Sequence, residues 1–304
     1  MKSSEASITS LISAFGRAYH STFDTPKVFD DHLAAKLITP EEFAQIRSNM
    51  VQGITFFNKD IAERFQNDPD EILKWIVQVQ LAPTPLARAA YCEQVIQNEI
   101  ALGLQQYVIL GAGFDTFGFR HREFENSIEI FEIDHPATQQ FKKQRLHDAG
   151  LAIPGNLHFI SMDFTKDFSS QDLIDQGFGQ KKTLFSLLGV SYYLSKEEIS
   201  RLIGELFALV PAGSSIVLDY ADETLFEEKG KFNRVDHMVK LAAAGGEPMK
   251  SCFAYPEIEH LLSQSGLLIY EHLSPAEIQE RYFNHRTDYL CAFEAVHYIH
   301  AVKK

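Results

Sequence analysis

A glycine-rich string directly after an apolar run is the first feature of this sequence that could do chemistry. The run YVIL at 107–110 continues into GAGFDT at 111–116, with glycines at Gly111 and Gly113. Glycines at the end of a strand permit a tight turn and let a ligand approach bare backbone amides. A G-x-G turn can also be purely structural, so the string alone leaves a ligand site and a simple turn as alternatives.

Acidic residues follow this string at spacings that suit a nucleoside. Asp134 closes the apolar run at 128–133, where an acid can accept both hydrogens of a ribose diol. Asp163 closes the next apolar run and could accept from an adenine amino group, with Phe164 lying against the ring. Each acid could instead cap a helix, because aspartate is a favoured N-cap residue.

Two residues of the string indicate which nucleotide-like ligand would fit. A dinucleotide fold places a third glycine where this chain has Thr116, and Asp115 puts a negative charge where a pyrophosphate would lie. This combination disfavours NAD. It favours a ligand whose corresponding group is cationic, such as S-adenosylmethionine with its ammonium and sulfonium groups.

The surrounding segments must form the elements that position these residues. Residues 1–105 show helical spacing of apolar residues, whereas the remainder alternates short apolar runs with helical stretches. The predicted strands are 107–110, 128–133, 157–162, 183–190, 215–220, 267–273 and 290–302, with helices at 136–149 and 195–209. This alternation predicts a doubly wound, mostly parallel sheet with helices on both faces and the last two strands as an edge pair. We expect a helical cap at 1–105 and an α/β domain at 106–304.

Composition excludes several classes of function. Of 304 residues, 45% are hydrophobic and 23% are charged, as in ordinary globular proteins. The net charge of −13 disfavours nucleic acids and anionic membranes as partners. The three cysteines (Cys92, Cys252 and Cys291) form no C-x-x-C pair, and no histidine pattern indicates a metal site. With no membrane-length apolar run and no signal peptide, the expected location is the cytoplasm.

Longer strings resemble one known family. VILGAGFDTFGFR at 108–120 and FEIDHP at 131–136 are similar to the leucine carboxyl methyltransferase family of S-adenosylmethionine-dependent O-methyltransferases, in particular its bacterial polyketide-type branch. Segments 17–37, 86–96 and 246–273 resemble further family segments, in the family's order. The resemblance implies a Rossmann-like class I methyltransferase fold with a seven-stranded sheet and an N-terminal helical cap.

The resemblance also implies roles for individual residues at the cofactor S-adenosylmethionine. Arg88 would bind the methionine carboxylate, and Arg17 matches a second basic position that reaches the cofactor; either could otherwise be a solvated helix charge. The other implied cofactor contacts are Gly111 and Gly113 for the methionine moiety, Asp134 for the ribose, and Asp163 and Phe164 for the adenine.

One departure from the family concerns the fourth predicted strand. Leu188 stands where the family carries a glutamate at the cofactor. Tyr192 and Tyr193 follow this strand and are candidates for contacts with the methyl acceptor, or for core packing. The predicted activity is O-methylation of a carboxylate or hydroxyl of a small molecule. An NAD(P)-dependent oxidoreductase and a catalytically silent methyltransferase-like binding protein stay open as alternatives.

Overall fold

The N-terminal third of the chain is helical. The computed structural model describes residues 7–166 and 169–304. The first helices are α1 (Ile8–Phe23), α2 (Pro40–Gln52), α3 (Ile54–Phe57), α4 (Lys59–Arg64), α5 (Pro69–Ile76) and α6 (Pro83–Ala101), with the short turns η1 (Ala34–Leu37) and η2 (Val77–Leu81). The predicted helical character is confirmed from Ile8 onward, and the first six residues lie outside the described part.

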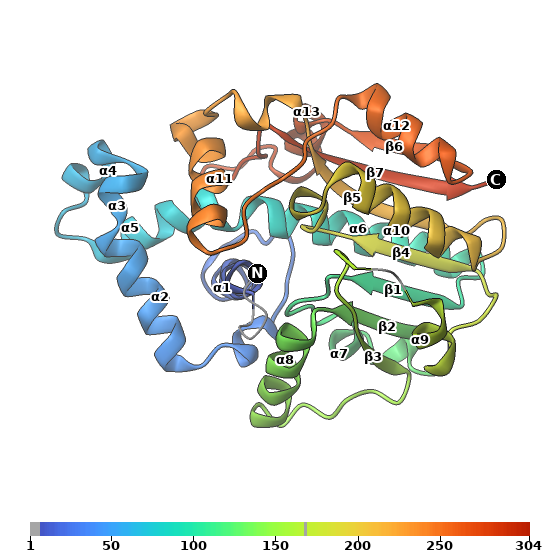
Figure 1. The fold of residues 1–304 in the computed structure, drawn as a ribbon. Helices are drawn as coiled ribbons and strands as arrows, with labels where there is room; N and C mark the ends of the chain where they lie inside the picture. The colour runs from blue at the N-terminus through green and yellow to red at the C-terminus, as the bar shows by residue number, and fades with distance from the viewer. Residues whose placement is uncertain (1–6, 167–168) are drawn as a thin grey trace.

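Seven strands form one sheet, as predicted. They are β1 (Gln106–Leu110), β2 (Glu129–Asp134), β3 (Leu157–Ser161), β4 (Thr183–Leu187), β5 (Ser215–Ala221), β6 (Leu267–Leu273) and β7 (Val296–Lys303). Their order is β3-β2-β1-β4-β5-β7-β6 (Figure 1). The first five strands pair in parallel, whereas β7 runs antiparallel to both β5 and β6. This topology confirms the doubly wound, mostly parallel sheet.

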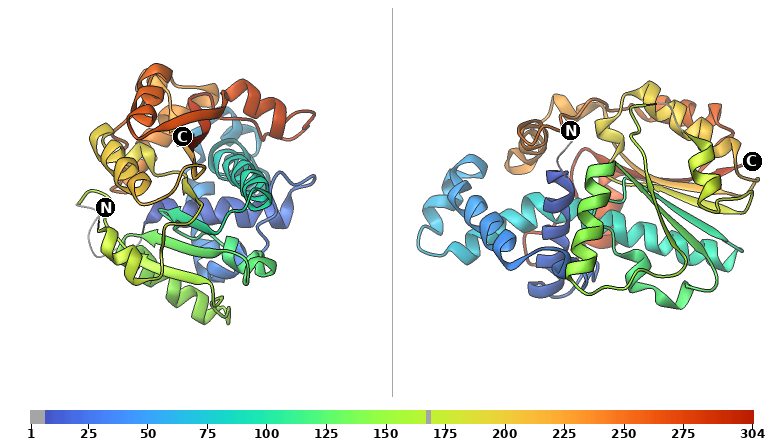
Figure 2. Two further views of the ribbon diagram at one scale, coloured as in Figure 1. Left: turned by 90° about the vertical axis from the view of Figure 1, so that its right-hand side faces the viewer. Right: turned by 60° about the horizontal axis from the view of Figure 1, so that its bottom comes forward.

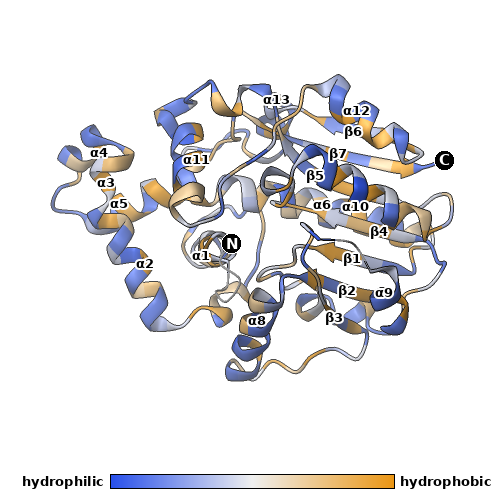
Figure 3. Ribbon diagram, viewed as in Figure 1, coloured by the Kyte–Doolittle hydropathy of each residue, from blue (hydrophilic) through white to orange (hydrophobic). Residues whose placement is uncertain are grey.

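Helices cover both faces of the sheet, so the central strands are buried along their whole length. Every residue of β1, β4 and β5 is buried. The remaining helices are α7 (Phe117–Arg120), α8 (Pro136–Asp148), α9 (Ser170–Asp175), α10 (Lys196–Ala208), α11 (Arg234–Ala244), α12 (Tyr255–Gln264) and α13 (Pro275–Tyr282). The side chains of β1 alternate between two cores, one shared with α6 and α7 and the other with α10 and α12. Figure 2 shows from two further sides how helices cover the sheet. In Figure 3, the hydrophobic residues, coloured orange, are concentrated on the strands.

Two helices link the cap to the rest of the chain. Helix α6 packs against β4, β5 and β7. Helix α11 comes from the second half of the sequence, yet His237 on it contacts the rings of Phe56 and Phe57 on α3, with ring centroids 4.8 and 5.7 Å apart. Elements before residue 105 thus contact elements after residue 106, and the domain boundary between these residues stays a prediction.

Local sequence signals mark the ends of several helices. Helix α10 begins with the predicted capping box, in which the Ser195 hydroxyl accepts from the Glu198 amide and the Glu198 carboxylate accepts from the Ser195 amide. Helix α2 begins with the same reciprocal pair at Thr39 and Glu42. Within the described ranges, no helix combines the length and the apolar character needed to cross a membrane.

Candidate functional site

The glycine loop between β1 and α7 requires glycine at two positions. Gly111 and Gly113 have φ angles of 72° and 49°, in the left-handed region that glycine adopts readily. A Cβ atom on Gly111 would lie 2.3 Å from Cγ2 of Val190, and one on Gly113 would lie 2.8 Å from Oγ of Ser10. The loop thus lies against both α1 and the segment after β4, leaving no room for a side chain.

Asp134 is bound to this loop. Its Oδ2 accepts from the Gly113 amide at 2.5 Å, and its Oδ1 accepts from the His135 amide at 2.6 Å. Burial raises the pKa of Asp134, while these two backbone donors act in the opposite direction. The N-cap residue of α8 is His135, whose Nδ1 accepts from the Ala137 amide. The alternative interpretation of Asp134 as the helix cap is therefore wrong.

Arg88 on α6 reaches the end of the sheet and meets a buried carboxylate. Its Nη1 donates to Oδ2 of Asp219 on β5 at 3.1 Å. The same Oδ2 accepts from the Tyr192 hydroxyl at 2.7 Å, and Oδ1 accepts from the Gly189 amide at 2.6 Å. Burial acts to lower the pKa of Arg88, but Asp219 outweighs it and the pKa is raised. Arg88 therefore stays charged, and it is not a solvated helix residue.

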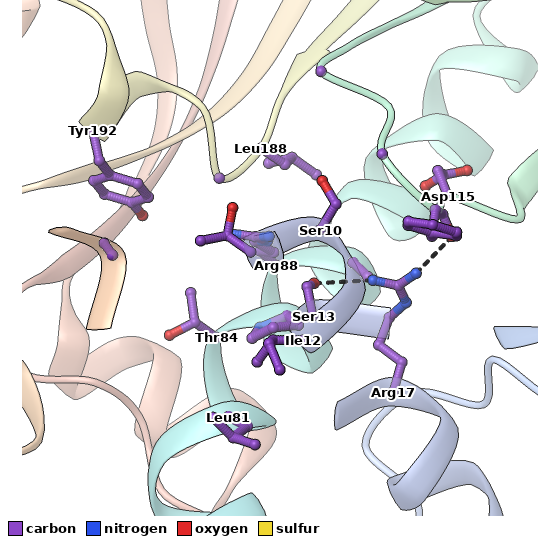
Figure 4. Close-up of a pocket in the computed structure, with 18 of the residues that line it drawn as sticks. Ser10, Ile12, Ser13, Arg17, Leu81, Thr84, Arg88, Asp115, Leu188 and Tyr192 are labelled. Atoms are coloured by element: carbon purple, nitrogen blue, oxygen red, sulfur yellow. Dashed lines mark hydrogen bonds between the residues drawn. The ribbon is translucent and has the colours of Figure 1, made fainter. Parts of the chain in front are cut away.

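Arg17 on α1 contacts the glycine loop. Its guanidinium donates to the Phe114 carbonyl at 2.7 Å, to Oγ of Ser13 at 3.1 Å and to Oδ2 of Asp31 at 2.9 Å. Figure 4 shows it extending from α1 toward the loop beside Asp115. Arg17 thus fixes α1 over the loop.

Asp115 and Thr116 both take part in local hydrogen bonds. Asp115 accepts from the Phe117 amide at 2.7 Å, at the start of α7. The hydroxyl of Thr116 donates to Oδ1 of Asp31 at 2.6 Å. Thr116 is buried, so a side chain fills the place that a third glycine would leave open.

A cavity of about 500 Å³ opens beside these residues. Its lining joins the glycine loop to the cap helices and includes most of the predicted site: Arg17, Arg88, Gly111, Gly113, Leu188, Tyr192 and Tyr193. In Figure 4, Arg88, Leu188 and Tyr192 lie around this space. The structure therefore brings together residues from α1, α6, β1 and the segment after β4.

Asp163 and Phe164, like Asp134, lie outside the lining of this cavity. Asp163 accepts from the amide and the hydroxyl of Thr165 at 3.1 and 2.7 Å and forms an ion pair with Lys166 at 3.2 Å. Both residues line a separate small hollow with Arg201 and its neighbours on α10. Their adenine contact stays a prediction.

Comparison with known proteins shows the family of this chain. The family model described as leucine carboxyl methyltransferase matches residues 10–207. The chain belongs to the leucine carboxyl methyltransferase family. A Bacillus subtilis protein, named "Putative S-adenosyl-L-methionine-dependent methyltransferase YktD", is 66% identical over the whole of both chains. A Mycobacterium ulcerans protein, also named as an S-adenosyl-L-methionine-dependent methyltransferase, is 29% identical over 55% of this chain and 54% of its own.

Solved structures resemble this chain more distantly. Magnesium protoporphyrin IX methyltransferase from Synechocystis, solved with bound S-adenosylhomocysteine, has a TM-score of 0.46 and 16% identity, over 81% of this chain and 99% of its own. An O-methyltransferase-like protein from Nostoc punctiforme has a TM-score of 0.47 and 13% identity, over 95% of this chain and 73% of its own.

Asp219 is a residue of the site that the sequence analysis missed. It interrupts the apolar run SIVLDY at 215–220, and its side chain is fully buried. A carboxylate within an otherwise apolar central strand needs a charged or multiply donating partner. That signal is present in the sequence, but it does not say that the partner is Arg88, 131 residues earlier.

Proposed function

We propose that this protein transfers a methyl group from S-adenosylmethionine to an oxygen atom of a small molecule, a carboxylate or a hydroxyl such as those of polyketide-type metabolites. The observation that carries the proposal is the single cavity that extends from the glycine loop and Arg88 to apolar side chains of the cap. The name of the 66%-identical relative supports the cofactor.

The residues at the inner end of the cavity fit this cofactor. Arg88 uses one Nη1 hydrogen bond for Asp219, so its guanidinium has further N–H groups for the methionine carboxylate. Gly111 and Gly113 both line this cavity, and their positive φ angles give the loop a backbone conformation that glycine adopts readily. Asp115 lines the same cavity and suits a ligand with a cationic centre rather than a pyrophosphate.

The bound cofactor would supply a methyl group on a sulfonium, and the protein's task is to align it with the acceptor. The Tyr192 hydroxyl donates a hydrogen bond to Asp219. Burial and this carboxylate raise the pKa of Tyr192 well above the usual range. Burial likewise raises the pKa of Tyr193 to about 12. Both phenols therefore keep their protons near neutral pH and orient groups rather than act as bases. A carboxylate acceptor needs no base, and an apolar cavity that excludes water favours its reaction with a cation.

A titration followed by a transfer assay tests the proposal. We expect S-adenosylhomocysteine to bind in calorimetry and NAD not to bind. Arg88→Ala should weaken the binding of S-adenosylhomocysteine by ~1.5–3 kcal/mol, the usual effect of losing a hydrogen bond to a charged group. Arg47→Ala is the matched control, because Arg47 lies on α2 and pairs with Asp70 at the surface.

The transfer assay distinguishes an enzyme from a silent binding protein. Methyl-labelled S-adenosylmethionine is incubated with pools of small carboxylic acids and phenols, and methyl esters or ethers are detected by mass spectrometry. Binding without any product from such pools would favour the silent binding protein. Binding of NAD in preference to S-adenosylhomocysteine would contradict the proposal.

A further inference from the structure

The cavity has an outer half that the cofactor residues do not form. The exposed members of its lining are Ile8 on α1, Asn49 on α2 and Ala244 on α11, so the cavity meets solvent between these three helices. We call the part of the cavity next to this opening the outer chamber. Its main side chains are those of Ile12, Met50, Met238, Leu241, Ala242 and Met249.

Among the residues that the structure describes, no charged side chain lines the outer chamber, although its helices carry many. On α2, Arg47 faces away and pairs with Asp70 of α5 at 2.7 Å. On α11, Lys240 pairs with Asp236 at 2.8 Å, and neither lines the cavity. Helices α2 and α11 therefore turn only uncharged side chains toward this space.

All charged side chains in the lining belong to the inner half of the cavity. They are Arg17, Asp31, Arg88, Asp115 and Arg120. Arg17 binds the glycine loop, and Arg120 pairs with Glu93. Arg88 binds Asp219 at the sheet. The carboxylate nearest the opening, that of Glu247, already accepts from the hydroxyls of Ser7 and Thr9. A charged group placed in the outer chamber would therefore lose its water without meeting a free opposite charge, which is costly.

The outer chamber is also lined by adaptable side chains. Three of the five methionines of the chain, Met50, Met238 and Met249, contribute to it. Methionine is unbranched and flexible, so it packs against apolar ligands of differing shape.

We propose that the outer chamber binds the body of the methyl acceptor, and that this body is an uncharged hydrocarbon chain or ring whose one reactive oxygen points inward to Leu188 and Tyr192. The proposal rests on the methyl transfer proposed above and adds the substrate class. It assigns specificity to α2 and α11 rather than to the sheet.

The affinities of straight-chain acids of increasing length test whether the outer chamber binds apolar groups. Hexanoic, octanoic and decanoic acids are titrated calorimetrically into the protein saturated with S-adenosylhomocysteine. We expect affinity to rise about fourfold per added methylene, which corresponds to ~0.8 kcal/mol for each buried CH₂. Adipic acid, which has the length of hexanoic acid but a second carboxylate at its far end, should not bind. Equal binding of adipic and hexanoic acids, or no gain with chain length, would overturn the proposal.

Charge substitutions place the binding in the outer chamber. Leu241→Glu and Ala244→Glu should each lower the affinity for decanoic acid at least tenfold while leaving the affinity for S-adenosylhomocysteine unchanged. Ala244 is exposed at the opening, so its substitution leaves no charge buried in the fold. Leu268→Glu is the control, because Leu268 is 53% exposed on edge strand β6 and does not line the cavity.

The outcomes separate this inference from the proposed function. If Leu268→Glu weakens decanoic acid as much as the two α11 variants do, the acid binds elsewhere and the chamber proposal is wrong. If S-adenosylhomocysteine itself does not bind, the proposed function fails, whereas the chain-length series without cofactor still reports on the chamber.

Discussion

At the scale of single residues, Asp219 is the point where three parts of the site meet. It joins Arg88 of α6, the Gly189 amide after β4 and the Tyr192 hydroxyl, all through one buried carboxylate. The resemblance to the family implies a glutamate at position 188, where this chain has leucine. The carboxylate that pairs with Arg88 is that of Asp219 on β5.

We expect Asp219→Asn to lower both stability and cofactor affinity. It removes the charge opposite Arg88 while keeping the size, and breaking a buried pair costs ~3–5 kcal/mol. Urea denaturation should show a loss near the lower end of that range, because Arg88 retains some contact with solvent. Asp70→Asn breaks an exposed pair and should cost at most ~1 kcal/mol. Equal losses in the two variants would refute a special role for Asp219.

Asp134 permits a similarly direct test. Asp134→Asn keeps the size of the side chain but loses its charge and one of two acceptor oxygens. If Asp134 binds the ribose, the binding of S-adenosylmethionine and of S-adenosylhomocysteine should weaken equally, by ~1.5–3 kcal/mol, because both ligands contain that sugar. Calorimetry measures both affinities. Unchanged affinity would show that Asp134 only braces Gly113 and His135.

At the scale of elements, helix α1 is the part of the cap that covers the glycine loop. The Ser10 side chain would touch a Cβ atom on Gly113, which shows how closely the two lie. The first turn of α1 is bound to the segment after α11: one carboxylate oxygen of Glu247 accepts from the hydroxyls of Ser7 and Thr9 at 3.1 and 2.5 Å. Two distant segments thus meet at the opening of the cavity.

We expect Glu247→Ala to loosen α1 without unfolding the protein. Hydrogen bonds to a charged acceptor contribute ~1.5–3 kcal/mol, so amide exchange in the first turns of α1 should accelerate at least tenfold. Hydrogen exchange followed by mass spectrometry measures this effect on residues 8–14. Glu227→Ala, at an exposed position after η5 (Glu223–Phe226), is the control. The same exchange rate in both variants would contradict the role of Glu247.

At the scale of the whole molecule, the cavity lies where cap and sheet meet, so a bound cofactor should stabilise both. A ligand at 100 times its dissociation constant adds ~2.7 kcal/mol to the free energy of unfolding. For a protein of this size we expect S-adenosylhomocysteine to raise the melting temperature by several degrees, at ~2 °C or more per kcal/mol. Differential scanning calorimetry measures the shift. No shift at millimolar ligand would contradict the cofactor assignment.

The features that the amino-acid sequence predicts correctly are those that depend on neighbouring residues. The helical first third, the seven apolar runs that became strands and the capping box at Ser195 are all local patterns, because side-chain periodicity and helix ends depend on residues a few positions apart. The string at 111–116 identified the loop after β1, and longer strings identified the family.

The tertiary structure alone decided which distant residues meet. The pairing of Arg88 with Asp219, the bond between Asp134 and Gly113, and the contact of α11 with α3 each join segments that no local pattern relates. Such contacts arise when a buried charge or an apolar helix face needs a partner, and only packing of the complete chain selects that partner. The outer chamber is of this kind, because helices α1, α2 and α11 become its walls only when the cap closes over the sheet.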